Sequence, residues 1–100
     1  MKHFRTLNLA VEFYRTVEGL KLASHLRTQL LRASSSIALN LAEGRGRGSV
    51  KDQKRFFQMA FGSVRECQAI MMLAGQGEGT LLWEQLDSLA AHLYKLIQRA

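Results

Sequence analysis

Residues 81–99 read LLWEQLDSLAAHLYKLIQR, and the leucines in this stretch recur at alternating steps of four and three. An α-helix completes a turn every 3.6 residues, so this spacing places the leucines along one helical face. The stripe consists of Leu82, Leu86, Leu89, Leu93 and Leu96. The stretch therefore predicts an amphipathic helix whose apolar face packs against other elements.

Three earlier segments have the same helical period, and glycines separate them. Glycine occurs at residue 19, in a cluster at residues 44–48 and in another at residues 75–79, and the chain has no proline. We predict helices at residues 5–19, 25–43, 50–74 and 81–99. The linkers between them are short, so consecutive helices should run antiparallel. The expected fold is all-α, an antiparallel up-down-up-down four-helix bundle formed by residues 1–100 as a single domain.

Polar residues and glycines mark the expected helix ends. Ser49 with Asp52 resembles a capping box, and Ser24 and Thr80 precede two of the apolar stripes. Glycine commonly follows the last turn of a helix because it adopts a left-handed backbone without strain. We therefore expect Gly44 and Gly75 to be C-terminal caps.

Composition and charge indicate a globular cytoplasmic protein with a basic surface. The chain is 47% hydrophobic, and no apolar run approaches the ~20 residues of a membrane span. The N-terminal residues lack the apolar centre of a secretion signal, and a single cysteine, Cys67, forms no internal disulfide and is expected in the core. The net charge is +6, with the basic excess in the first three quarters of the chain. Such a field attracts polyanions, so we suspect nucleic acid or an acidic protein as a partner.

A second set of apolar residues lies on the helix faces opposite the predicted core. Single apolar residues at a surface are ordinary, but three helices share the feature, which favours self-association. The expected oligomer surface consists of Leu7, Val11, Tyr14, Leu31, Leu39, Phe61 and Met72.

A polar stripe runs between the two apolar faces of the second and third helices. It consists of Arg32, Ser36, Asn40, Glu43, Gly62, Ser63 and Glu66. We expect Arg32 to reach Glu66 across antiparallel helices, both largely buried, with Asn40 buried and hydrogen-bonded and Gly62 allowing a close backbone approach. A structural seam is the favoured interpretation, since buried pairs often fix geometry, and a ligand pocket is the alternative.

The run from Gln29 to Cys67, QLLRASSSIALNLAEGRGRGSVKDQKRFFQMAFGSVREC, closely resembles the signature of a bacterial four-helix-bundle family first noticed as proteins encoded by intervening sequences in large-subunit ribosomal RNA genes. The resemblance implies an up-down-up-down bundle that assembles into a ring, usually a pentamer. It also implies a distant relation to accessory proteins of diversity-generating retroelements, in which a basic ring binds nucleic acid and a reverse transcriptase. The resemblance covers essentially the whole chain.

The sequence contains no pattern typical of a catalytic site. The three histidines fall in three segments, no two share a helix face, and the glycine-rich loop lacks the Lys-Ser/Thr of a nucleotide-binding loop. We predict no catalytic residue, no cofactor site and no metal site.

The glycine-rich loop instead concentrates positive charge. Its cations are Arg45, Arg47, Lys51, Lys54 and Arg55. We predict a non-catalytic, ring-forming accessory protein whose basic end binds RNA or single-stranded DNA, with a reverse transcriptase as a candidate partner. A solvated turn on a protein-interaction scaffold is the alternative.

Overall fold

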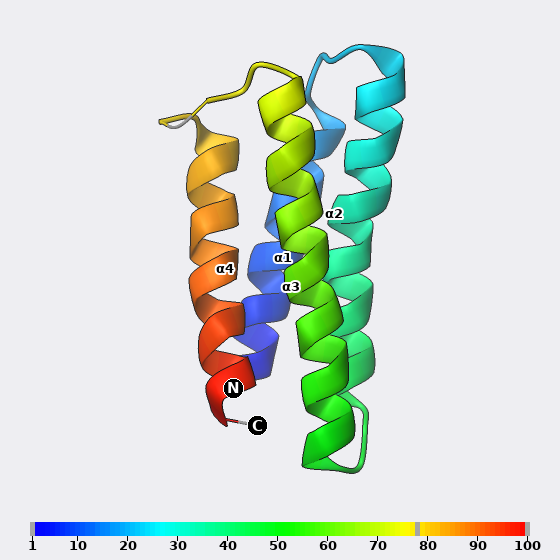
Figure 1. Cartoon of the computed structure of the whole chain (residues 1–100), viewed down its shortest axis with the longest axis vertical. Coiled ribbons are helices and arrows are strands. Elements are labelled where there is room, and N and C mark those ends of the chain that lie inside the picture. Colours follow the sequence, from blue (N-terminus) through cyan, green and yellow to red (C-terminus); the bar gives the residue numbers. More distant parts are fainter. Residues whose placement is uncertain (1, 78, 100) are drawn as a thin grey trace.

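The computed structural model describes the backbone of residues 2–77 and 79–99 and the side chains of residues 5–77 and 79–99. Its four helices are α1 (Lys2–Glu18), α2 (Ser24–Arg45), α3 (Val50–Leu73) and α4 (Leu81–Arg99). Each predicted helix is present, with bounds that differ by three residues or fewer. Consecutive helices run in opposite directions (Figure 1), which confirms the predicted all-α four-helix bundle.

The helices form a closed circuit around one core. α2 packs against α1 and α3, and α4 packs against α3 and α1. As Figure 1 shows, both chain termini and the α2–α3 turn lie at one end of the bundle, and the other two linkers lie at the opposite end. The molecule measures 40 × 23 × 19 Å, so these two ends are the small faces of an elongated bundle.

The core contains the apolar stripes that the sequence indicated. All five leucines of the α4 stripe are buried, and Phe13, Ile37 and Val64 from the other helices are fully enclosed with them. Cys67 is also buried in this cluster, as expected. Among the described residues, no helix is both long enough and apolar enough to span a membrane.

Two of the three expected N-terminal caps are present. The Ser49 hydroxyl accepts the N–H of Asp52 at 3.1 Å, and the Thr80 hydroxyl accepts the N–H of Trp83 at 3.3 Å. The prediction for Ser24 is wrong: Ala23 is the N-cap of α2, no side chain caps this end, and Ser24 is the first helical residue.

The two expected C-terminal glycines differ in role. Gly75 has φ +76°, and the N–H groups of Gly75 and Gln76 donate to the carbonyls of Met72 and Met71 at 3.2 and 2.9 Å. This Schellman arrangement confirms Gly75 as a terminating glycine. The prediction for Gly44 is wrong, because Gly44 is a buried residue inside α2, which continues to Arg45 with Gly46 as its C-cap. Its missing side chain makes room for Phe56 and Phe57 of α3, since a Cβ there would lie 2.8 Å from the Phe57 ring.

Candidate nucleic-acid interface

The end of the bundle that contains the α2–α3 turn holds the excess positive charge. Three chain segments meet there, residues 2–11, 43–55 and 88–99 (Figure 1). Together they contain nine basic and two acidic residues, a net charge of +7, whereas the rest of the chain contains five basic and six acidic residues. The net charge of the protein is therefore concentrated at one end, which we call the basic end.

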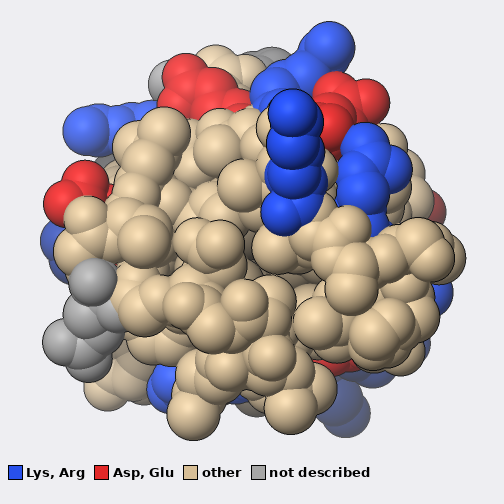
Figure 2. All heavy atoms as spheres, turned by 90° about the horizontal axis from the view of Figure 1, so that it is seen from above, with Lys and Arg blue, Asp and Glu red and all other residues tan. Residues whose placement is uncertain are grey.

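The opposite end has a different character. In Figure 2, which looks onto the α1–α2 and α3–α4 linkers, uncharged residues form most of the visible surface and charged side chains lie mainly toward one edge. The exposed apolar side chains Met72, Leu73 and Leu81 belong to this end. The net positive charge therefore lies toward the basic end.

Two of the five predicted loop cations form ion pairs and ring contacts within the chain. Arg47 pairs with Glu43 at 3.1 Å and with Asp52 at 3.8 Å, and Arg55 pairs with Asp52 at 3.0 Å. Both guanidinium groups also stack on the ring of Phe56, each 4.6 Å from its centroid. Arg47 therefore also helps to cover a nearly buried aromatic ring.

The remaining loop cations are placed differently. Lys51 is exposed and Lys54 is half-buried, and the described part of the chain provides neither with a hydrogen bond or an ion pair. They line a shallow recess of about 370 Å³ beside the first turns of α3, together with Ser49, Asp52, Arg55 and Gln58. Arg45, in the last turn of α2, is half-buried and already interacts with another group of the protein. Lys51 and Lys54 are thus the loop side chains best placed to meet a phosphate.

The polar stripe forms the expected cross-helix contact but is less buried than predicted. Arg32 of α2 and Glu66 of α3 form an ion pair, yet their side chains are 62% and 42% exposed. Asn40 is half-buried and donates to the carbonyl and the hydroxyl of Ser36 at 2.9 and 3.1 Å, and the Ser63 hydroxyl bonds that of Ser36 at 3.0 Å. The burial predicted for Arg32 and Glu66 is wrong, because the pair lies at the rim of the α2–α3 contact.

Two further stripe residues lie outside this network. The Glu43 carboxylate faces Arg47 at the basic end. Gly62 is exposed, and a Cβ built on it would meet nothing within 4 Å, so it provides no close backbone approach. Gly44 of α2 provides the close backbone approach to α3 instead.

Replacement of Glu66 by Ala should lower the free energy of unfolding by less than about 1 kcal/mol, because exposed ion pairs are weak in water. A buried pair would cost about 3–5 kcal/mol on loss of one partner. Urea denaturation of the wild type and Glu66→Ala measures the difference. A loss above 3 kcal/mol would show that the pair is shielded from solvent in the state that exists in solution.

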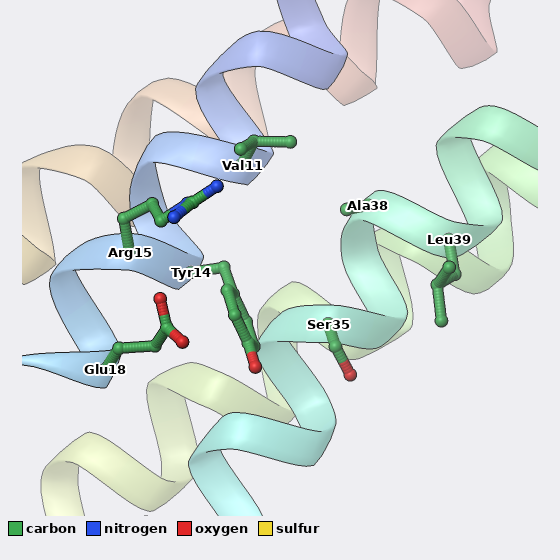
Figure 3. A pocket seen from close by; sticks show the side chains of 7 residues that line it. All are labelled: Val11, Tyr14, Arg15, Glu18, Ser35, Ala38 and Leu39. Carbon is green, nitrogen blue, oxygen red and sulfur yellow. The ribbon is translucent and has the colours of Figure 1, made fainter.

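The predicted oligomer surface divides into three parts. Val11, Tyr14 and Leu39 line an open groove of about 360 Å³ between α1 and α2, whose rim carries Arg15 and Glu18 (Figure 3). Leu7, Leu31 and Phe61 were expected to face outward and are instead partly buried against the core. Met72 lies in the last turn of α3, at the end of the bundle opposite the basic end. The exposed apolar surface is therefore smaller and less continuous than the helical period indicated.

Three cations of the basic end were missed by the sequence analysis, namely Arg5, Lys95 and Arg99. They lie at opposite ends of the chain and become neighbours only because α1 and α4 are antiparallel partners. The sequence carried one signal of them, the absence of any acidic residue after Asp87. Among the described residues no three His, Cys, Asp or Glu side chains are grouped to hold a metal ion, and His3 lies outside the described side chains.

Comparison with known protein families identifies a match. Residues 4–99 match the model of the family described as 23S rRNA-intervening sequence protein, and this match covers nearly the whole chain. No curated protein matches the sequence.

Proposed function

The chain belongs to the 23S rRNA-intervening sequence protein family, and from this premise we propose that it is a non-catalytic accessory protein that forms a ring and binds nucleic acid through its basic end. The partner protein in this proposal is a reverse transcriptase or another protein that handles RNA. The observation that carries the proposal is the net charge of +7 in the segments of the basic end, on a molecule of net charge +6.

The expected mode of binding is contact with the phosphate backbone without reading of bases. Lys51 and Lys54 are cations without a partner among the described residues, which suits phosphate contact. Sequence-specific readout of single strands usually depends on exposed aromatic rings on which bases stack. The ring nearest the loop, Phe56, is covered by Arg47 and Arg55. Affinity should therefore depend on salt much more than on sequence.

Joint replacement of Lys51 and Lys54 by Gln should weaken binding of a fluorescent single-stranded oligonucleotide and reduce its salt dependence. Each lost phosphate contact removes about 0.7 from the log-log slope of affinity against salt, so two contacts remove about 1.4 per engaged subunit. Fluorescence anisotropy over a series of NaCl concentrations measures the slope. Arg47 is left intact, because its loss would also disturb the packing around Phe56.

The matched control removes two charges away from the basic end, through Lys21→Gln and Arg65→Gln. Both side chains are exposed, and because Arg65 also contacts Gln68 and the ring of Phe61, circular dichroism verifies that the control keeps its fold. The control should retain nearly the wild-type slope, and oligonucleotides of different sequence should lose affinity alike in the Lys51/Lys54 variant. Absence of any binding by the wild type at low salt would reject the nucleic-acid role and favour the scaffold alternative.

Assembly is tested separately at the groove between α1 and α2. Leu39 is 68% exposed there, and Leu39→Glu should reduce the mass measured by light scattering from a multiple of 11.3 kDa toward the single chain. Insertion of a carboxylate into an apolar contact carries a desolvation cost, which is the reason for the loss. Leu73→Glu, at a residue 75% exposed but outside the groove, is the control. A wild type that is monomeric at micromolar concentration would contradict ring formation.

A further inference from the structure

We propose that Arg5, Lys95 and Arg99 form a second phosphate-binding site at the basic end, between the first turns of α1 and the last turns of α4. The inference rests on the proposed function, since the phosphate in question belongs to the nucleic-acid backbone. It extends the interface from the α2–α3 turn to the other pair of helices and assigns a role to cations that the loop does not contain.

The site is built by the antiparallel contact of α1 and α4. His92, Lys95 and Arg99 recur at steps of three and four, which places them on one face of α4. Arg5 approaches from α1, and the recess between the two helices is half open to solvent, with a volume of about 160 Å³. The floor of the recess is formed by Thr6 and Leu96, which are both buried.

Among the described residues, none that lines this recess is acidic. Residues 2–11 and 88–99 contain no aspartate or glutamate at all. Within the described part of the chain, Arg5, Lys95 and Arg99 make no hydrogen bond or ion pair, in contrast to Arg47 and Arg55 at the loop. No described side chain therefore neutralises their charge, which is available to an anion.

His92 adds a polar group with a defined orientation. Its Nδ1 lies 2.8 Å from the carbonyl oxygen of Ser88 and donates a hydrogen bond to it. The remaining ring nitrogen, Nε2, is left for a partner in the recess. Arginine and lysine side chains that converge with a ring nitrogen on one recess are typical of phosphate recognition.

A purely structural role is the alternative explanation for these cations. Arginine in the last turn of a helix is stabilised by the negative end of the helix dipole, which would explain Arg99 without a ligand. That explanation does not include Lys95, which precedes the last turn, or Arg5, which lies in the first turns of α1, where the dipole favours negative charge. The N-terminal end of α1 and the C-terminal end of α4 act on an anion in the recess in opposite senses, so the attraction comes from the three side chains.

The two basic clusters belong to helix turns at the same end of the bundle (Figure 1), which measures 23 × 19 Å across its shorter axes. One strand of nucleic acid bound at this end can meet both the Lys51 and Lys54 cluster and the recess. Contacts from both clusters within each subunit then act on the same strand and add their counterion release.

The test removes each cluster alone and both together. The variants are Lys51→Gln with Lys54→Gln, Lys95→Gln with Arg99→Gln, and all four, with Lys21→Gln and Arg65→Gln as the control. The full chain is titrated into a fluorescent single-stranded oligonucleotide at several salt concentrations. Circular dichroism and light scattering verify that each variant keeps its helices and its assembly. A second measurement follows the backbone NMR signals of residues 5–6 and 92–99 during titration of the wild type with pyrophosphate.

The expected result is a slope reduced by about 1.4 per engaged subunit when the recess is neutralised, and by about 2.8 in the fourfold variant, since four single-strand contacts of about 0.7 each are lost. Pyrophosphate should shift the signals around the recess in the wild type and not in Lys95→Gln with Arg99→Gln. If the recess variant keeps the control's slope while the Lys51/Lys54 variant loses affinity, the recess inference is wrong and the proposed function stands. If the wild type binds no nucleic acid at low salt, both are wrong.

Discussion

Iodoacetamide at pH 7.5 should alkylate Cys67 at least about a thousandfold more slowly in the folded protein than in the urea-unfolded chain. The thiolate is the reactive form, and burial in the core, helped by the nearby Glu66 carboxylate and opposed by Arg32, raises the pKa of Cys67 from 9.0 to about 12. A rise of three units lowers the thiolate fraction at neutral pH about a thousandfold. Mass spectrometry of timed samples measures both rates.

The same shift predicts how stability depends on alkaline pH. The folded state holds the thiol proton more tightly than the unfolded state, so the contribution of Cys67 is fully present below pH 9 and is lost as the pH rises toward 12. Cys67→Ala should remove this component, so its stability should fall less steeply than that of the wild type over this range. Folded-state alkylation as fast as that of the unfolded chain would show that Cys67 is open to solvent and that its pKa is not raised.

Alanine at residue 44 and alanine at residue 62 should change stability in opposite directions. A Cβ at residue 44 would lie 2.8 Å from the Phe57 ring and 3.0 Å from Phe56 Cβ, so neighbouring side chains must shift. Such overpacking costs about 1–3 kcal/mol, of which the helix preference for alanine recovers up to about 1 kcal/mol, so the expected net change is a loss of up to about 2 kcal/mol. A Cβ at residue 62 meets nothing within 4 Å, and alanine favours the helix over glycine by about 1 kcal/mol.

Thermal unfolding measures both changes. For a domain of this size each 1 kcal/mol corresponds to a shift in Tm of about 4–8 °C, so Gly44→Ala should melt below the wild type and Gly62→Ala above it. The two variants control for each other, because each makes the same chemical change inside a helix. Equal shifts of the same sign would contradict the packing of α2 on α3 around Gly44.

The helices could be predicted from the sequence because their signals are local. The leucine stripe of residues 82–96, the Ser49 cap and Gly75 each depend on neighbours within a few turns, and each is confirmed. Gly44 was misread for the same reason: a glycine near the end of an apolar stripe has the local pattern of a cap, while its actual constraint is the ring of Phe57 on another helix. The prediction that Leu31 and Phe61 face outward was wrong for a similar reason. The helical period gives the direction of a side chain around its own helix, and it does not show how much of that side chain a neighbouring helix covers.

The candidate site was predicted only in part. The sequence located the cations of the α2–α3 turn, since they are close along the chain, and it paired Arg32 with Glu66 by assuming that α2 and α3 are antiparallel. It did not reveal that Arg47 and Arg55 are occupied by Glu43, Asp52 and Phe56, because ion pairs and ring contacts depend on side-chain geometry.

The sequence by itself determined four amphipathic helices, an apolar core and an excess of positive charge, since these follow from residue type and from spacing at the helical period. Only the tertiary structure decided where the charge lies. The antiparallel pairing of α1 with α4 brings Arg5 beside Lys95 and Arg99, and the even number of helices returns both chain ends to the end that carries the α2–α3 turn. Charges far apart along the chain thereby act on the same small face, and the physical reason is that electrostatic attraction depends on distance in space and not on separation in sequence.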